Sequence, residues 1–419
     1  MGEMKSKDNQ EKSTNPNYKS SNNVQVDLLH LFCWILIYSF YLTSFIYSPV
    51  INDDAVNIKL LQALVTGETN LLDHIKFYTL AWIEAQGRFF PGAVAYGSFL
   101  YSFLSVEIYY KLVISFIPIG LALITYKILN RFVKIENFIP FFAIILLSLQ
   151  FRWSTTVTWD GITGFTGLPL LSLAIYSGSL ILLFKSTKYK ILSIFVTYFA
   201  FVTYETVVII AFPVLFYLLK YYKSEFKIHS VPFLITLISI FYFRSQRKGN
   251  DWAYQIDLDL GKFLEMTISQ LISALPGGII WGNMTTFSEG ISYQKTAIWL
   301  LLIYLPTYII ISGQKLIVKE SRIQYRIILI ALWVIVSSTF LTSLIPRWQE
   351  TLPFAQTYIS SSYSFFGTGL LLYATNNLII SYIANQSTNK YSQVKLEIFS
   401  ILFSFIISVN YLFHVIIIK

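Results

Sequence analysis

The sequence predicts an all-α protein, a polytopic membrane helix bundle of about ten or eleven spans. Its 419 residues have a mean hydropathy of +0.59. Only 13% of them are charged, against about 25% in soluble domains. Apolar stretches of about 18 or more residues recur along the chain, as membrane-spanning helices require. Helices are expected throughout, because an open sheet edge has no hydrogen-bond partners in lipid.

The chain divides into two parts. Residues 1–27 are polar and predict a disordered cytoplasmic tail, whereas residues 28–419 read as one multi-span transmembrane domain. The single cysteine, Cys33, lies in the first apolar run, so no disulfide and no cysteine metal site is expected within one chain. We expect no cofactor, and the sequence leaves a requirement for a divalent metal ion open.

Basic residues orient the predicted spans. Lysine and arginine gather on the cytoplasmic side of membrane proteins. Six clusters are assigned to that side: residues 5–19, 127–134, 185–190, 220–227, 315–326 and 390–395. The N-terminus is then cytoplasmic, and the outer loops comprise about residues 51–106, 152–165, 244–295 and 345–357.

The elements follow in order. The first span ends at Val50, a second covers about 107–128, and the segment 137–151 is predicted to run outward again. Only about 30 residues separate the cytoplasmic clusters at Lys190 and Lys220. That length fits two short helices with their turn at "TYET" (203–206) near the outer surface.

Three outer segments are expected not to cross the membrane. The stretch 88–104 is apolar but short and rich in small residues, which predicts a helix that only dips into the membrane. The segments 58–65 and 263–275 are amphipathic at helical spacing, as is typical of helices at the membrane interface.

Carboxylates and arginines collect on the predicted outer face. The side chains assigned there are Asp53, Asp54, Arg88, Asp160, Glu205, Arg244 and Arg347. The planar fork of arginine suits a phosphate, and a carboxylate can take the proton of an acceptor hydroxyl. The sequence contains no P-loop, no histidine pair for zinc and no nucleophile elbow.

Each of these residues has a predicted role. Asp54 is the candidate base with Asp53 as its neighbour, or the reverse, and the plainer alternative is that both mark the end of the first span. The candidates for substrate binding are Arg88, Asp160, Glu205, Arg347 and Arg244. A carboxylate at the tip of an apolar hairpin is costly without a partner. We therefore expect Glu205 to pair with an outer arginine, Arg347 being the first choice.

The order of these motifs resembles a family. An acidic pair in a long first outer loop is followed by "GRFFP" (87–91), by "TYET", and by "PRW" (346–348) before "YISSSYSFFGTGLLL" (358–372). This order resembles the GT-C class of integral-membrane glycosyltransferases, and within it the bacterial glucosyltransferases that decorate the O-antigen of lipopolysaccharide. The resemblance covers about residues 28–383. The chain departs from some relatives in stopping at Lys419, without their large soluble C-terminal domain.

The resemblance implies a function. It implies a polyprenyl-phosphate sugar donor, a cell-surface glycan or lipid acceptor, and inversion at the sugar carbon. Asp53 or Asp54 would be the base, and Gly87-Arg88 would match the Gly-Arg of the same loop. The location implied is the cytoplasmic (inner) membrane of a bacterium, with the active site on the outer face. Membrane lipid is the further expected partner, and nucleic acid is not expected.

Three other functions remain open at this point. A lipid-linked-sugar flippase or transporter would place its charges near the membrane midplane and often shows internal repeats. An O-antigen polymerase or ligase would use one large late outer loop, and residues 244–295 keep that reading open. A membrane scaffold gives no reason for acids gathered on one face.

Overall fold

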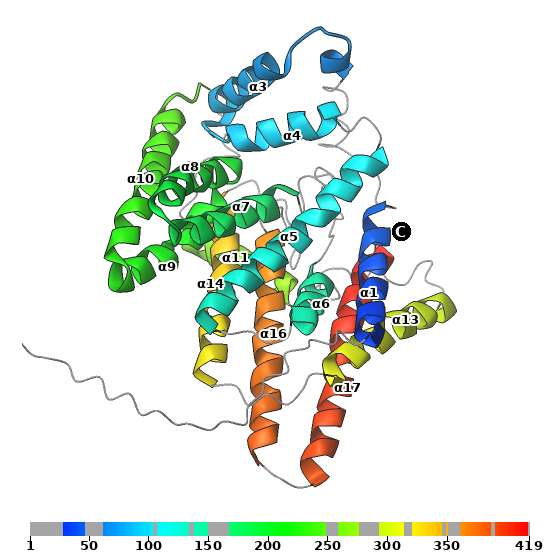
Figure 1. Ribbon diagram of the computed structural model, residues 1–419. Coiled ribbons are helices and arrows are strands. Elements are labelled where there is room, and N and C mark those ends of the chain that lie inside the picture. The colour runs from blue at the N-terminus through cyan, green and yellow to red at the C-terminus, as the bar shows by residue number, and fades with distance from the viewer. Residues whose placement is uncertain are drawn as a thin grey trace, which may run out of the picture.

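The described part of the chain is almost entirely helical (Figure 1). The computed structural model describes residues 28–46, 62–103, 107–133, 138–149, 167–248, 259–275, 293–313, 321–345, 349–350, 361–386 and 390–417. The helices are α1 (Leu28–Ile46), α3 (Leu71–Gln86), α4 (Pro91–Phe103), α5 (Glu107–Val133), α6 (Phe138–Ser148), α7 (Leu168–Leu183), α8 (Thr187–Thr203), α9 (Thr206–Tyr221), α10 (Lys223–Ser245), α11 (Leu260–Ala274), α13 (Tyr293–Ser312), α14 (Ser321–Ser343), α16 (Ser361–Gln386) and α17 (Lys390–Ile417). No strand occurs within these ranges, so the predicted all-α bundle is confirmed.

Four of the described helices are long and apolar enough to cross a membrane. Their apolar parts are Lys111–Asn130, Lys223–Ser245, Ile323–Phe340 and Ser392–Leu412. Shorter apolar stretches occur in α1, α6, α7, α9 and α13. Length and composition thus identify a membrane protein, and the total of ten or eleven spans stays a prediction.

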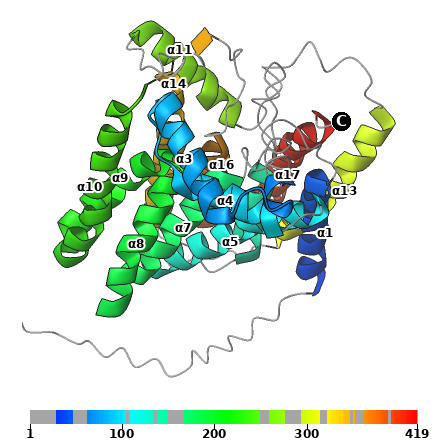
Figure 2. The ribbon, with the colours of Figure 1, turned by 90° about the horizontal axis from the view of Figure 1, so that it is seen from above.

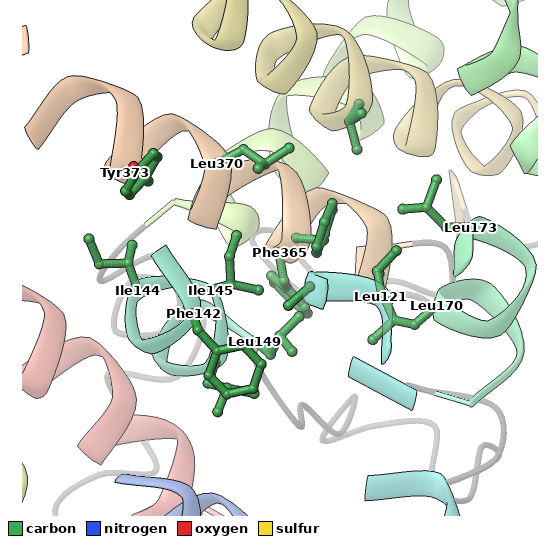
Figure 3. Packing of buried hydrophobic residues seen from close by; sticks show 14 of the residues in the cluster. Leu121, Phe142, Ile144, Ile145, Leu149, Leu170, Leu173, Phe365, Leu370 and Tyr373 are labelled. Atoms are coloured by element: carbon green, nitrogen blue, oxygen red, sulfur yellow. The ribbon is translucent and has the colours of Figure 1, made fainter. Parts of the chain in front are cut away.

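The core forms around α6 (Figure 3). Every residue from Pro140 to Ser148 is buried, because α6 is apolar on all sides and is enclosed by α1, α5, α16 and α17. The described helix within the outward span predicted at 137–151 has 11 residues, or about 16 Å, against a hydrocarbon core of about 30 Å. Residues 137, 150 and 151 lie outside the described residues, so this span stays a prediction.

The predicted tight hairpin is confirmed. Helix α8 ends at Thr203 and α9 begins at Thr206, so the turn falls at Tyr204 and Glu205. At the far end of α8, Lys190 Nζ lies 2.7 Å from Glu225 Oε1 of α10. This ion pair joins two of the basic clusters that were assigned to the same side of the membrane.

A tryptophan compensates for a proline in α9. Pro213 has no N–H, so the carbonyl of Ile209 one turn earlier lacks its helical donor. Trp333 of α14 donates a hydrogen bond from Nε1 to that oxygen, at 3.2 Å. The bond fixes α14 beside α9 at the point where α9 is weakest.

The short helix predicted at 88–104 is present as α4. It has 13 residues and packs against α3 and α8. At about 1.5 Å per residue it reaches roughly 20 Å, too little to span a membrane. In Figure 2, the view from above, α3 and α4 cover one end of the bundle, and α4 packs there against α8.

Helix α11 is amphipathic as predicted. Its polar face is buried and its apolar face is exposed, whereas a helix on the surface of a soluble protein exposes its polar face. Its polar side chains Ser269, Gln270 and Ser273 are buried, and the helix packs against α14 and α16. Leu264 and Ile268 on the opposite face are about half exposed. The polar face therefore points into the bundle, and the apolar face is available to lipid. The other predicted interfacial segment, 58–65, lies mostly outside the described residues.

Candidate functional site

The structure brings three of the seven predicted site residues together. Arg88 follows α3, Glu205 lies in the α8–α9 turn, and Arg244 lies in the last turn of α10. The remaining four, Asp53, Asp54, Asp160 and Arg347, lie outside the described residues.

Arg88 and Glu205 form the centre of the described site. Arg88 Nε donates to Glu205 Oε1 at 2.9 Å, although 117 positions separate the two residues in the chain. The side chains are 26% and 27% exposed. Glu205 also occupies the N-cap position of α9, where the helix dipole favours a negative charge. Glu205 thus pairs with an arginine, as predicted, and that arginine is Arg88; the first choice, Arg347, lies outside the described residues.

One aromatic ring lies over the guanidinium group, and further aromatic contacts pack next to it in the chain. Arg88 Cζ lies 4.6 Å from the centre of the Phe90 ring, and the Phe90 ring lies 5.0 Å from that of Trp82. Phe89 stacks on Phe243 of α10 at 4.2 Å. Such contacts hold a cation in place without neutralising it.

Gly87 explains why an arginine can stand at this corner. It ends α3 with φ 66° and donates its N–H to Ile83 O, a conformation that costs glycine little. A Cβ at this position would also lie 3.0 Å from Arg244 Cα. Glycine therefore allows the end of α3 to reach the end of α10, and Arg88 comes next in the chain.

Gly92 brings α4 against α8. A Cβ on Gly92 would lie 2.9 Å from Thr203 Cα and would contact Thr203 Oγ1. Because Thr203 is the last residue of α8 and Glu205 follows two positions later, this close approach sets the separation of Arg88 from Glu205. The glycines of "GRFFPG" (87–92) thus both serve to assemble the ion pair.

A hydroxyl network lies behind the carboxylate. The ring of Tyr204 lies 5.9 Å from that of Tyr363 in α16, and Tyr363 shares a 2.5 Å hydrogen bond with Ser172 of α7. Both of the latter residues are fully buried. Sequence reasoning missed these side chains, although "TYET" and "YISSSYSFF" had both been noted as motifs.

A second, exposed ion pair flanks the site. Lys248 Nζ lies 2.7 Å from Glu84 Oε1, and the Lys248 N–H donates to the Glu84 carbonyl oxygen at 3.0 Å. These bonds connect the chain after α10 to the last turn of α3. They place Lys248 close to the end of α3 that Arg88 follows.

The segment that carries the acidic pair follows helix α1 in the chain and lies outside the described residues. Lys111 of α5 donates from Nζ to Ile46 O at 3.1 Å, which places the end of α1 beside the start of α5. Helix α5 starts shortly after α4 ends, and α3 packs on α4. Figure 1 shows the end of α1 below the right-hand end of α4. The chain therefore leaves the described structure beside the start of α5, and its next described residues lead into α3.

Among the described residues, no three His, Cys, Asp or Glu side chains are grouped so as to hold a metal ion. No family model matches the sequence, and neither a curated protein nor a solved structure matches it.

Proposed function

We propose that the protein is a membrane glycosyltransferase that moves a sugar from a polyprenyl-phosphate donor to a surface glycan or lipid acceptor, with inversion at the sugar carbon. The observation that carries the proposal is the meeting of Arg88 with Glu205, beside Arg244, where α8 and α9 join and α10 ends. A polyprenyl phosphate keeps its tail in lipid and presents its phosphate at that depth. The resemblance of the motif order to GT-C enzymes supports the same reading.

In this proposal each group has a defined role. Arg88 contacts the donor phosphate and stabilises the negative charge that grows as the phosphate leaves. Glu205 is a positioning residue, because it binds Nε of Arg88 and thereby orients the guanidinium plane. Asp54, or Asp53, accepts the proton of the acceptor hydroxyl while the new glycosidic bond forms. Asp160, Arg244 and Arg347 complete the binding surface for donor and acceptor.

The test is a direct assay of transfer. The purified full chain is incubated with a panel of polyprenyl-phosphate sugars and membrane glycolipids, and the release of free polyprenyl phosphate is measured. The Asp53→Asn, Asp54→Asn double variant is the control for background hydrolysis. Release that depends on both acceptor and the two aspartates is expected. Movement of the lipid-linked sugar across vesicles without release would instead identify a flippase.

A further inference from the structure

The start of α8, around Lys190, lies at the opposite end of the helix from Glu205 and is rich in lysine and tyrosine. Lys190 and Tyr204 stand 14 residues apart along the helix, or about 20 Å. Near Lys190 the α7–α8 loop meets the α9–α10 junction. Phe184 and Tyr222 pack ring to ring at 5.1 Å. Arg326 of α14 lies near the Tyr217 hydroxyl of α9.

Exposed lysines and tyrosines dominate this end. We name the set the lysine–tyrosine belt: Lys185, Lys188, Lys220, Lys223, Lys227, Arg326, Tyr189, Tyr217, Tyr221 and Tyr325, all of them exposed. In the described stretches 184–190, 217–227 and 323–326 the single acid is Glu225, and Lys190 already pairs with it. The belt therefore keeps a large unbalanced positive charge.

Two of the belt lysines lie over tyrosine rings. Lys185 Nζ lies 4.8 Å from the centre of the Tyr189 ring, and Lys220 Nζ lies 5.1 Å from that of Tyr221. Tyrosine is enriched where membrane meets water, because its ring is apolar and its hydroxyl is polar. A lysine seated over such a ring presents its ammonium group at the depth of the lipid headgroups.

We propose that the lysine–tyrosine belt binds anionic phospholipid headgroups of the membrane leaflet at this end of the bundle. The chemistry is phosphate contact by paired ammonium groups, with the tyrosine rings at the headgroup boundary. A basic residue near an anionic membrane surface contributes about 1 kcal/mol. Two lysines on one headgroup then give a preference over a neutral lipid on the order of 25-fold. The belt is independent of the proposed transfer reaction, since it lies at the other end of α8.

The experiment measures lipid affinity on the detergent-solubilised full chain. Phosphatidylglycerol and phosphatidylcholine are titrated separately, and the bound lipid is counted by native mass spectrometry. Phosphatidylglycerol should bind on the order of 25-fold more tightly at low salt, and high salt should remove most of that preference. Equal affinity for the two lipids at low salt would overturn the proposal.

Matched variants locate the site. Lys185→Gln/Lys220→Gln should lose most of the preference, whereas Lys185→Arg/Lys220→Arg, which keeps both charges, should retain it. Lys76→Gln/Lys262→Gln removes the same charge from exposed lysines of α3 and α11 and should bind both lipids as the parent chain does. Retention of the full preference by the Lys185→Gln/Lys220→Gln variant would exclude the belt as the site. Loss of it in the Lys76→Gln/Lys262→Gln variant would show that net charge alone is responsible.

Discussion

The ion pairs Arg88–Glu205 and Lys190–Glu225 stand at opposite ends of α8, and their surroundings differ. Arg88 and Glu205 come from segments 117 positions apart, and two glycines are needed to bring them together. Lys190 and Glu225 lie 35 positions apart, within a compact set of neighbouring helices. At the Arg88 end, close backbone contacts at two glycines hold a single arginine in place. At the Lys190 end, one ion pair forms and many other lysines are exposed. The comparison separates charges that are positioned for a ligand from charges that face a surface.

The largest effect should come from the acidic pair that is assigned to the Arg88 end. We expect Asp54→Asn to lower sugar transfer at least a hundredfold, because an amide cannot take the acceptor's proton. Asp53→Asn should lower it less. Expression and donor binding, followed by immunoblot and by lipid co-purification, should remain near normal. Near-normal transfer by the double variant would show that the two carboxylates only mark the end of a span.

Glu205→Ala should affect both activity and stability. Removing the carboxylate leaves the guanidinium of Arg88 without this partner, at a cost of about 1–3 kcal/mol for a charged group in a partly buried site. Since both side chains are about one quarter exposed, a value near the lower end is expected. Thermal unfolding and kcat against KM are measured for Glu205→Ala and Glu205→Gln. The glutamine retains an acceptor for Nε and should recover part of both losses. A variant that loses activity with an unchanged Tm would argue that Glu205 contacts substrate directly.

Gly92→Ala tests the close approach of α4 to α8. The new methyl group contacts Thr203 and should cost about 1–3 kcal/mol by overpacking. It should also lower transfer, because α4 must move and Arg88 lies three residues before it. Gly120→Ala in α5 is the matched control, since a Cβ there meets nothing within 4 Å, and it should be neutral or stabilising by up to about 1 kcal/mol. Equal Tm values for the two variants would contradict the role given to Gly92.

The smallest effects should come from the simple ion pairs. Lys190→Ala should lower the free energy of unfolding by about 0.5–1 kcal/mol, and Lys248→Ala by less than about 0.5 kcal/mol. The difference follows from exposure, because the Lys190 and Glu225 side chains are 22% and 16% exposed, whereas those of Lys248 and Glu84 are 75% and 57% exposed. Chemical denaturation in the same detergent measures both. The reverse order would show that exposure does not rank these pairs.

Hydropathy and charge patterns predicted those features of the fold that depend on local sequence. The helical class, the turn at Tyr204-Glu205 and the short helix at α4 all follow from length and composition. The partner of Glu205 did not, since nothing in a single sequence selects Arg88 over Arg347. Gly87 and Gly92, which bring Arg88 to Glu205, act through contacts between α3 and α10 and between α4 and α8. Tyr363 and Ser172 were missed for the same reason, because a buried hydroxyl pair becomes visible only when α16 and α7 are packed.

The inward polar face of α11 bears on how the protein is made. Gln270 and Ser273 are covered by α14 and α16, and Thr368 of α16 donates to Ala274 O at 2.8 Å. Both covering helices are translated after α11. Until they are in place, entry of α11 into hydrocarbon would strip water from the Gln270 amide without replacing it. We therefore expect α11 to stay at the aqueous boundary during synthesis and to dock after its later neighbours are inserted, so that assembly of this bundle does not follow the order of translation.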